Sequence, residues 1–336
     1  MSSSVRTESV MVQNLCVPCC CRCRYCLLSC DGRTVGIPWE RSKAFARRFI
    51  EESRLTLPGL ECSFSFGYSM EHPELREALR FLKSVGSPQS RFLQCDGMKN
   101  RDERECGLLA DMLAEEGVTD LNFTFYGTPE YHDRFAGRKG DHELMLRMIR
   151  AAAAAGLNVT VGIPLTRENI GQTEELVTTL RESGCGRVRL FIPHEEGRGV
   201  SIAPIRLRES DLALLSDDTR GLLNASVYRA EREWIAEDRS SETRRALLVS
   251  LTPENIDRYE RMSAASIVSE IEALDDAYYA AFPVFSELAD RYGDPDGELM
   301  YIKRDLSYHY RRLFAKEFGV GVYDVTDERQ SGSRRY

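Results

Sequence analysis

Seven of the eleven cysteines stand within the first thirty residues of this acidic chain, namely Cys16, Cys19, Cys20, Cys21, Cys23, Cys26 and Cys30. Thiolates are soft ligands that hold zinc or iron–sulfur clusters. A common zinc site uses a second ligand pair downstream, whereas the other four cysteines here stand singly, at Cys62, Cys95, Cys106 and Cys185. The short loop therefore favours an iron–sulfur cluster, with a structural zinc knuckle as the alternative.

Two sets of these cysteines have the spacing CxxxCxxC. One set is Cys16, Cys20 and Cys23, and the other is Cys19, Cys23 and Cys26. An aromatic residue, Tyr25, precedes the last cysteine of the second set, whereas Arg22 holds that place in the first. Since Cys23 belongs to both sets, the spacing alone leaves both open.

Length and composition exclude several classes of protein. A net charge of −8 argues against nucleic acid held on a basic face. No apolar run is long enough for a transmembrane helix, and the first residues lack a signal-peptide core. Many unpaired thiols are typical of a reducing compartment. We therefore expect a cytoplasmic protein with no nucleic-acid partner and no membrane segment.

The rest of the chain alternates strand and helix patterns, and each strand pattern ends in a polar or glycine-bearing segment. The expected strands cover residues 9–15, 61–66, 91–94, 120–126, 159–165 and 187–192, with helices between them. Six such alternations predict parallel strands joined by helical crossovers, in a barrel or a doubly wound sheet. Of these, the fold expected is α/β, a partial (β/α)6 TIM-like barrel, with the cysteine loop at the carboxyl edge of the strands.

The pattern changes after Pro204. One more strand is expected at 246–251, followed by mainly helical, tyrosine-rich sequence over 262–318. The expected domains are a core barrel over 9–200, a mainly helical substrate or lid region over 201–320, and a flexible tail over 321–336.

With Tyr25 before its last cysteine, the second set resembles the CxxxCx-aromatic-C loop of radical S-adenosylmethionine (SAM) enzymes. The resemblance selects Cys19, Cys23 and Cys26 as ligands of a 4Fe–4S cluster, with Tyr25 beside it. In that family one iron stays open for the amino and carboxylate groups of SAM. The resemblance therefore implies two cofactors, a 4Fe–4S cluster and SAM.

Further segments are similar to motifs of the same family, in its branch with molybdenum-cofactor and peptide-modifying members. Residues 66–69 resemble the GGEP segment that holds the SAM amino group, which implies Phe66, Gly67, Tyr68 and Ser69. Residues 124–135 resemble the SLDG…HDxF segment, which implies Thr124 at the SAM ribose and Tyr126 facing the substrate. The family's arginine that pairs with the SAM carboxylate is Ala136 here, so Arg134 or Arg138 is the expected substitute.

Two later segments complete the resemblance. Residues 165–169 are close to the LTxEN sequence near the ribose and carboxylate, which implies Thr166 and Asn169, and the sixth strand implies Ile192 against adenine. The same five-residue pattern recurs at 251–255, and we interpret both copies as strand-to-helix caps. Because the last cysteine is Cys185, auxiliary-cluster cysteines of the peptide-modifying relatives are missing and a single cluster is expected.

The implied chemistry is radical hydrogen abstraction, fed by a reducing partner such as flavodoxin or ferredoxin. The outcome is left open among epimerisation, dehydrogenation and carbon–carbon bond formation, with Cys95 as the hydrogen donor that epimerisation would need. The expected substrate is a small polar metabolite, such as a sugar, aminoglycoside or nucleoside, in natural-product tailoring. The alternatives are a ribosomally made peptide substrate and a non-catalytic zinc or iron–sulfur protein.

Overall fold

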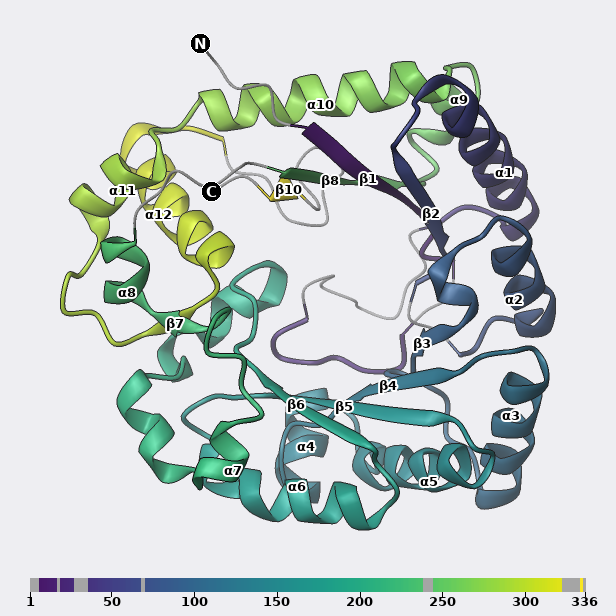
Figure 1. Ribbon diagram of the computed structural model, residues 1–336, viewed down its shortest axis with the longest axis horizontal. Helices are drawn as coiled ribbons and strands as arrows, with labels where there is room; N and C mark the ends of the chain where they lie inside the picture. Colours follow the sequence, from purple (N-terminus) through teal and green to yellow (C-terminus); the bar gives the residue numbers. More distant parts are fainter. Residues whose placement is uncertain are drawn as a thin grey trace.

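The computed structural model describes residues 6–16, 19–26, 36–67, 70–237, 244–321 and 333–334. Two parallel sheets face each other, with helices on their outer sides, and the cysteine segment runs between them (Figure 1). Each sheet has one apolar face that packs against helices, which is the arrangement that buries a parallel sheet. The predicted α/β architecture with parallel strands is therefore confirmed.

The first sheet is built around β1 (Arg6–Gln13). It pairs in parallel with β2 (Glu61–Ser65) on one side and with β8 (Arg244–Ser250) on the other, and β10 (Ser333–Arg334) pairs antiparallel with β8. The outer face carries Val10 and Val12, which are buried in the same core as Phe45 and Phe49 of α1 (Trp39–Thr56). Helix α10 (Ala264–Ala280) lies beside α1 on this outer side (Figure 1).

The second sheet has the strand order β3, β4, β5, β6, all parallel. The strands are β3 (Phe92–Gln94), β4 (Asp120–Thr124), β5 (Asn158–Pro164) and β6 (Arg187–Phe191). Their outer side is covered by helices, in chain order α2 (Leu75–Ser84), α3 (Glu103–Glu115), α4 (Pro129–Ala136), α5 (Asp141–Ala154) and α6 (Thr173–Glu182), with α2 towards β2 (Figure 1). Each predicted strand of residues 91–192 is thus found within a few residues of its expected place.

Strand β8 comes from the part of the chain that the sequence predicted to be mainly helical. The strand itself was expected, but its place beside β1 was not. The register pairs Val10 with Leu247 and Val12 with Val249, so that both sheet strands bury the same apolar face. The C-terminal half therefore supplies a strand to the barrel. The domain limits at residues 200 and 320 stay predictions, and most of the expected tail lies outside the described residues.

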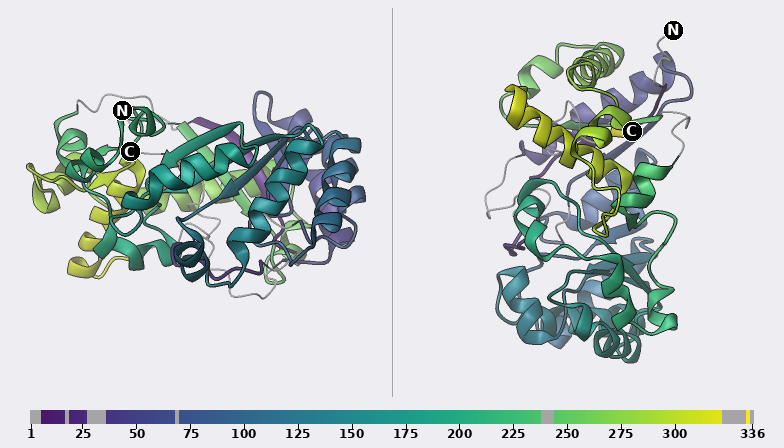
Figure 2. Two further views of the ribbon diagram at one scale, coloured as in Figure 1. Left: turned by 90° about the horizontal axis from the view of Figure 1, so that it is seen from below. Right: turned by 90° about the vertical axis from the view of Figure 1, so that its left-hand side faces the viewer.

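The remaining C-terminal elements are short, except for the last helix. They are α7 (Asp217–Arg220), β7 (Arg229–Ala230), α8 (Glu231–Ala236), α9 (Ile256–Tyr259), α11 (Phe285–Tyr292), β9 (Met300–Tyr301) and α12 (Lys303–Phe318). Four 3₁₀ stretches connect elements, at Pro88–Ser90, Ile170–Gln172, Gly197–Ile205 and Glu209–Leu214. Figures 1 and 2 agree that α10, α11 and α12 lie on the side of the first sheet, away from α5 and α6.

Helix α12 is tied to the segment that follows β6. His194 contacts Asp305 at 3.1 Å, and the buried carboxylate of Glu195 contacts His309 at 2.7 Å and Arg312 at 2.6 Å. Such buried ion pairs fix the relative position of two elements, because breaking one leaves an uncompensated charge. None of the helices in the described ranges has the length and apolar character needed to cross a membrane.

Candidate functional site

A cavity of about 1020 Å³ lies between the cysteine segment and the second sheet. Among the described residues, it is lined by the cysteine segment, by residues in and just after β3 to β5, by the length of β6, by His194 after β6, and by residues 221–228. The last of these runs alongside β6, where Leu190 N donates to Leu222 O at 3.1 Å. Ligand sites in parallel α/β folds occur at the carboxyl ends of strands, so this cavity is the candidate active site.

Alternation along the strands decides which side chains reach the cavity. Its lining from the sheet consists mainly of Gln94, Asp96, Asn122, Thr124, Tyr126, Gly162, Arg187, Arg189 and Phe191, and the largely buried Leu190 also borders it. The intervening residues point the other way into the apolar core beneath the helices, and they include Cys95, Phe123, Phe125, Val161, Ile163, Val188 and Ile192. Successive strand residues face opposite sides, so a shift of one position moves a residue from the cavity to the core.

Cys19, Cys23 and Cys26 all line the cavity. Cys21 points away from it, because its thiol is buried and lies 3.6 Å from Asp141 Oδ2. Cys16 packs partly buried against the apolar core. Of the two sets with the right spacing, the structure thus brings the second together on one wall. Cys30 lies outside the described residues.

The cysteine segment is held in place mainly through its backbone. Cys20 N donates to Gly97 O at 3.1 Å, Arg22 N to Ala136 O at 2.7 Å and Arg24 N to Phe135 O at 3.0 Å. Gly97 has φ +72°, and a Cβ there would come within 2.2 Å of the Cys19 sulfur. A glycine is required at this position for both reasons, since only glycine adopts this φ freely and leaves the space.

Arg198, in the segment after β6, also holds the cysteine segment in place through hydrogen bonds. Its Nε donates to Cys23 O at 3.1 Å, and its backbone N donates to Cys26 O at 3.1 Å. The cysteine backbone is therefore anchored to the turn after β3, to the end of α4 and to the segment after β6. Ligands fixed by several rigid elements are pre-positioned for a metal.

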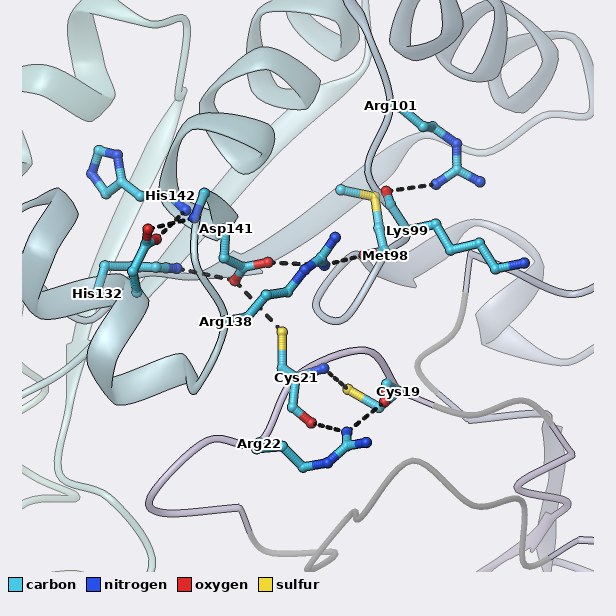
Figure 3. A network of polar contacts seen from close by, with 12 residues as sticks. Cys19, Cys21, Arg22, Met98, Lys99, Arg101, His132, Arg138, Asp141 and His142 are labelled. Carbon is cyan, nitrogen blue, oxygen red and sulfur yellow. Dashed lines mark hydrogen bonds and ion pairs between the residues drawn. The ribbon is translucent and has the colours of Figure 1, made fainter.

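A buried polar network packs against the cysteine segment at Cys21 (Figure 3). Asp141 contacts His132 Nε2 at 3.1 Å and Arg138 Nη1 at 3.1 Å, and it also faces the Cys21 thiol. His132 Nδ1 accepts a hydrogen bond from Tyr126 N at 3.2 Å, so its Nε2 carries the proton donated to Asp141. The network therefore joins the end of β4 to the cysteine segment, and His132 is a positioning residue.

Tyr126 reaches the second cysteine of the set. Its hydroxyl donates to Cys23 Sγ at 3.2 Å, and its ring packs at 4.7 Å from Phe135 and edge-on at 5.6 Å from Tyr25. Burial raises the pKa of Tyr126 well above its usual value, so the hydroxyl stays protonated and remains a donor. Tyr25 also lines the cavity and lies 6.4 Å from Phe191.

Asp96 places a carboxylate in the cavity wall, where it contacts Thr124. It accepts hydrogen bonds from Thr124 N at 2.9 Å, from Thr124 Oγ1 at 2.8 Å and from Gln94 Nε2 at 2.5 Å. Burial nevertheless raises the pKa of Asp96 to about 6, because desolvation outweighs these hydrogen bonds. The Thr124 hydroxyl is thus engaged with Asp96, and both side chains face the cavity.

The set of three thiols fits an iron–sulfur cluster. Three sulfurs stand on one wall of a cavity, on a loop whose backbone is already anchored. The neighbouring Cys21 thiol and burial raise the pKa of Cys19 well above its usual value. Since metal-bound cysteine is a thiolate, metal binding must displace that proton.

Comparison with known proteins agrees with this geometry. The model of the radical SAM superfamily matches residues 15–180, which span the cysteine segment and strands β2 to β5. The chain carries a radical SAM domain. Proteins of this superfamily use a 4Fe–4S cluster and SAM, so the cofactors implied by the sequence are confirmed.

Individual relatives of the radical SAM domain are distant. PqqA peptide cyclase of Gluconobacter oxydans (strain 621H) is 24% identical over 222 residues, which are 62% of this chain and 60% of that protein. The match therefore spans less than two thirds of that relative. Streptococcus suis SuiB bound to S-adenosylmethionine aligns with 12% identity and a TM-score of 0.49, over 73% of this chain and 59% of that chain. Native anSMEcpe with bound AdoMet aligns with 13% sequence identity and a TM-score of 0.46, over 92% of this chain and 97% of that chain.

The structure places the predicted residues of the radical SAM domain in three groups. Those in the cavity are Cys19, Cys23, Tyr25, Cys26, Thr124 and Tyr126. Tyr68 and Ser69 lie outside the described residues. The third group is not part of the cavity lining and consists of Phe66, Gly67, Cys95, Arg134, Thr166, Asn169 and Ile192. The roles assigned to all of them stay predictions.

Two residues of the third group each stand one position away from a residue that lines the cavity. Cys95 is fully buried in the apolar core, and its neighbours Gln94 and Asp96 line the cavity instead. Ile192 is 1% exposed in the same core, and Phe191 lines the cavity. A hydrogen donor and an adenine contact at these positions would require the opposite strand face.

Phe66 and Arg134 are also displaced from the expected contacts. Phe66 is buried against Trp39 and His72, so only its backbone remains for the role that the resemblance implies. Arg134 is exposed on α4, with its guanidinium over the Tyr131 ring at 5.1 Å. Gly67 has φ +88° beside Leu15, as a turn after β2 requires.

Thr166 and Asn169 form a buried turn after β5. Asn169 Oδ1 accepts from Thr166 N at 2.7 Å, and Asn169 Nδ2 donates to Pro164 O at 2.7 Å and to Tyr126 O at 2.7 Å. The similar segment after β8 has the same bonds, since Asn255 Oδ1 accepts from Thr252 N at 3.0 Å and Nδ2 donates to Ser250 O at 2.7 Å. Both copies are therefore strand-ending turns, and Asn169 additionally holds the end of β4.

Sequence reasoning missed several residues that line the cavity, in β6 and in the segment that follows α7. They are Arg187, Arg189, Phe191 and the segment 221–228. A signal for the first three was present, because residues 187, 189 and 191 share the strand face opposite to the apolar Val188 and Leu190. Nothing in the pattern of 221–228 indicated that it would lie beside β6.

Proposed function

We propose that this radical SAM enzyme modifies a ribosomally made peptide. The observation that carries the proposal is the 24% identity over 222 residues with a protein named PqqA peptide cyclase. A small polar metabolite was the first expectation from the sequence, and no curated relative of that kind supports it. The peptide alternative is therefore the better-supported substrate class.

The cavity extends along β6 beyond the cysteine segment. Its volume lies at the upper limit of the range of about 300–1,000 Å³ for pockets of one drug-sized molecule. The cavity of about 1020 Å³ reaches from the cysteine segment to Arg187 at the start of β6, so a peptide segment could share it with SAM. The wall from Gln94 to Thr124 is polar, which suits a substrate with backbone amide and carbonyl groups.

Each cavity residue has a role in this proposal. When bound, the cluster and SAM supply a 5′-deoxyadenosyl radical that abstracts hydrogen from an unactivated carbon. Cys19, Cys23 and Cys26 hold the cluster, and the Tyr126 hydroxyl orients and stabilises the Cys23 thiolate. Phe191 offers a flat apolar surface to the adenine. Residues 221–228 and the α12 ion pairs close the side of β6 and exclude water from the reacting groups.

The position of Cys95 bears on the outcome of the reaction. Epimerisation requires a hydrogen donor at the substrate carbon, and Cys95 lies behind the strand in the apolar core. In an oxidative outcome the peptide would lose one hydrogen atom to 5′-deoxyadenosine and then one proton and one electron, with SAM as the net oxidant, so no donor from the cavity wall is needed. We therefore favour an oxidative modification such as bond formation between two positions of the peptide.

The test uses the full chain, purified without oxygen and reconstituted with iron and sulfide. The enzyme is incubated with SAM and dithionite and then with one of two additions: pools of synthetic nine-residue peptides, or a mixture of sugars, nucleosides and aminoglycosides. We expect 5′-deoxyadenosine to form faster with a peptide pool, and mass spectrometry to show peptides lighter by two hydrogens.

The two other outcomes contradict the proposal in different ways. Acceleration by the metabolite mixture alone would restore the small-molecule substrate. A protein that binds zinc, or that never cleaves SAM, would be a non-catalytic metal-binding protein. A Cys23→Ala variant, which lacks a residue common to both cysteine sets, controls for SAM cleavage that does not depend on the cluster.

A further inference from the structure

Two arginines stand on the cavity wall formed by β6. Arg187 and Arg189 line the cavity with exposed side chains, whereas Val188 and Leu190 are buried in the core, and Leu190 only borders the cavity. Residues two apart on a strand face the same side, so the two guanidinium groups point into the same space. Both side chains are exposed to that space.

Neither arginine has an ion pair or a side-chain hydrogen bond among the residues that the structure describes. Other arginines of the chain do have such partners. Arg24 contacts Glu168 at 2.9 Å, and Arg206 contacts Glu195 at 3.2 Å. The chain has 53 acidic against 45 basic residues, so carboxylates for pairing are plentiful. Two unpaired positive charges inside a cavity of this acidic chain are thus available to a ligand.

The strand register shows how far Arg187 and Arg189 lie from the carboxyl ends of the strands. Arg189 pairs with Gly162, which pairs with Thr124, so these three residues form one layer across the sheet. Arg187, Thr160 and Asn122 form the next layer towards the amino ends of the strands. Layers two residues apart are separated by about 6.6 Å. The cysteines lie beyond the opposite, carboxyl ends, so the arginines occupy the end of the cavity away from the cluster.

Neutral side chains lie beside the pair, and the segment after β6 adds His194 to the cavity wall, where it contacts the buried carboxylate of Asp305. The strands next to β6 contribute Gly162 without a side chain and Asn122 with an amide, and the flanking segment contributes Asn224 and Tyr228. The carboxylate of Asp96 stands with Thr124, to which it is hydrogen-bonded, on the far side of Gly162. An anion entering beside Arg187 and Arg189 would therefore meet two positive charges and few competing negative ones.

We propose that Arg187 and Arg189 bind a carboxylate of the substrate peptide, and so fix which residue of the peptide faces the cluster. This inference rests on the proposed function and names its substrate class as a carboxylate-bearing peptide. A guanidinium pairs with a carboxylate through two parallel hydrogen bonds, and such charge-assisted pairs are stronger than neutral ones. Holding one end of the substrate at the arginines leaves a carbon nearer the cysteines for hydrogen abstraction.

The test uses four pools of rhodamine-labelled, N-acetylated nine-residue peptides. The central residue is Glu or Gln, and the C-terminus is a free acid or an amide. Binding to the reconstituted holoenzyme with SAM is measured by fluorescence polarisation. We expect pools with a carboxylate to bind about tenfold tighter than the Gln amide pool, as charge-assisted hydrogen bonds imply. Tighter binding of the Glu amide pool would indicate a side-chain carboxylate, and tighter binding of the Gln free-acid pool would indicate the C-terminal carboxylate.

The double variant Arg187→Gln/Arg189→Gln should abolish this preference and leave binding of the Gln amide pool unchanged. Arg181→Gln is the matched control, because Arg181 is an exposed arginine of α6 outside the cavity lining. A preference that survives in the double variant, or equal binding of all pools to the wild type, would overturn the inference while leaving the peptide proposal standing.

Two further results would also overturn it and can be told apart. If the double variant raises the KM for SAM in the cleavage assay and keeps the peptide preference, the arginines bind the SAM carboxylate. If no pool binds the holoenzyme although it cleaves SAM, the peptide proposal itself fails, and the inference fails with it.

Discussion

The two faces of the sheet formed by β3 to β6 differ in chemistry, although alternating residues of the same strands form both. One face carries Cys95, Phe123, Val161 and Ile192 against the helices, and it is close-packed and apolar. The other carries polar and aromatic groups such as Asp96, Thr124, Arg189 and Phe191, and it lines the cavity. The same strand end therefore holds a structural and a functional residue in adjacent positions.

This difference explains why a motif can indicate the right segment of a strand and still name a residue whose neighbour lines the cavity. A segment places the chain at the carboxyl edge of the sheet, but only the alternation decides which side chain enters the cavity. Each face makes its own prediction. Substitutions on the helix face should lower stability through lost packing without changing SAM chemistry, whereas substitutions on the cavity face should change SAM chemistry or the pH dependence of stability, without a comparable loss of packing.

The largest expected effect comes from substitutions of the adjacent residues Phe191 and Ile192 at the end of β6. Ile192→Ala should lower the free energy of unfolding by about 2–5 kcal/mol, because it leaves a cavity in the core. Phe191→Ala should cost less stability and raise the KM for SAM by about threefold to tenfold, as loss of one aromatic contact implies. Urea unfolding and the SAM cleavage assay measure the two effects. A higher KM in the Ile192 variant would reverse the assignment of faces.

Asp96 gives the next effect, a dependence of stability on pH. Burial raises the pKa of Asp96 to about 6, above the value of an unfolded aspartate near 3.8. The native state therefore binds a proton that the unfolded state releases between these values. The contribution of Asp96 to stability is present below about pH 4 and is lost as the pH rises through 6. Urea midpoints of the metal-free protein should show this loss, and Asp96→Asn should remove it. An unchanged slope in that variant would contradict the raised pKa.

A smaller effect is expected from Tyr126→Phe, which removes the hydroxyl that donates to Cys23 Sγ. The loss of one hydrogen bond is worth about 0.5–1.5 kcal/mol, and the reduction potential of the cluster should fall, since the sulfur loses a donor. Tyr131→Phe is the matched control, because its hydroxyl contacts Glu168 at 3.1 Å. Potentiometric EPR titration measures the shift. The same shift in both variants would argue against a specific contact with Cys23.

Cys95→Ala should have the smallest effect. It removes one buried sulfur from the core, at a cost of about 1 kcal/mol, and should leave the reaction product unchanged. Product analysis by mass spectrometry in deuterated buffer is the measurement. A product that loses its solvent-derived deuterium in this variant alone would make Cys95 the hydrogen donor after all.

Much of the architecture could be predicted because it depends on local pattern. Helix α1 and the strands up to β6 follow from hydrophobic periodicity and from capping residues, and the cysteine spacing with Tyr25 selects the set that the structure brings together. Long-range placement could not be predicted. The position of β8 beside β1, and of 221–228 beside β6, depends on which apolar faces pack together across more than thirty residues of chain.

The site was predictable only to the level of the segment. Thr124 and Tyr126, which the resemblance implied, line the cavity, and the alternation applied to β6 selects Phe191 as the lining residue in place of Ile192. The pattern at 165–169 indicated a ligand contact by resemblance, yet its hydrogen bonds are those of a buried turn that also occurs at 251–255. A polar residue type at a strand end does not distinguish a ligand contact from a backbone cap.

The most direct test of the account compares the two cysteine sets one residue at a time. Alanine variants of Cys16, Cys19, Cys20, Cys21 and Cys26 are reconstituted without oxygen, and iron content and SAM cleavage to 5′-deoxyadenosine are measured. The account predicts that Cys19→Ala and Cys26→Ala lose the cluster and SAM cleavage, while the variants of Cys16, Cys20 and Cys21 keep both. Loss in Cys16→Ala and Cys20→Ala, with retention in Cys19→Ala and Cys26→Ala, would contradict it.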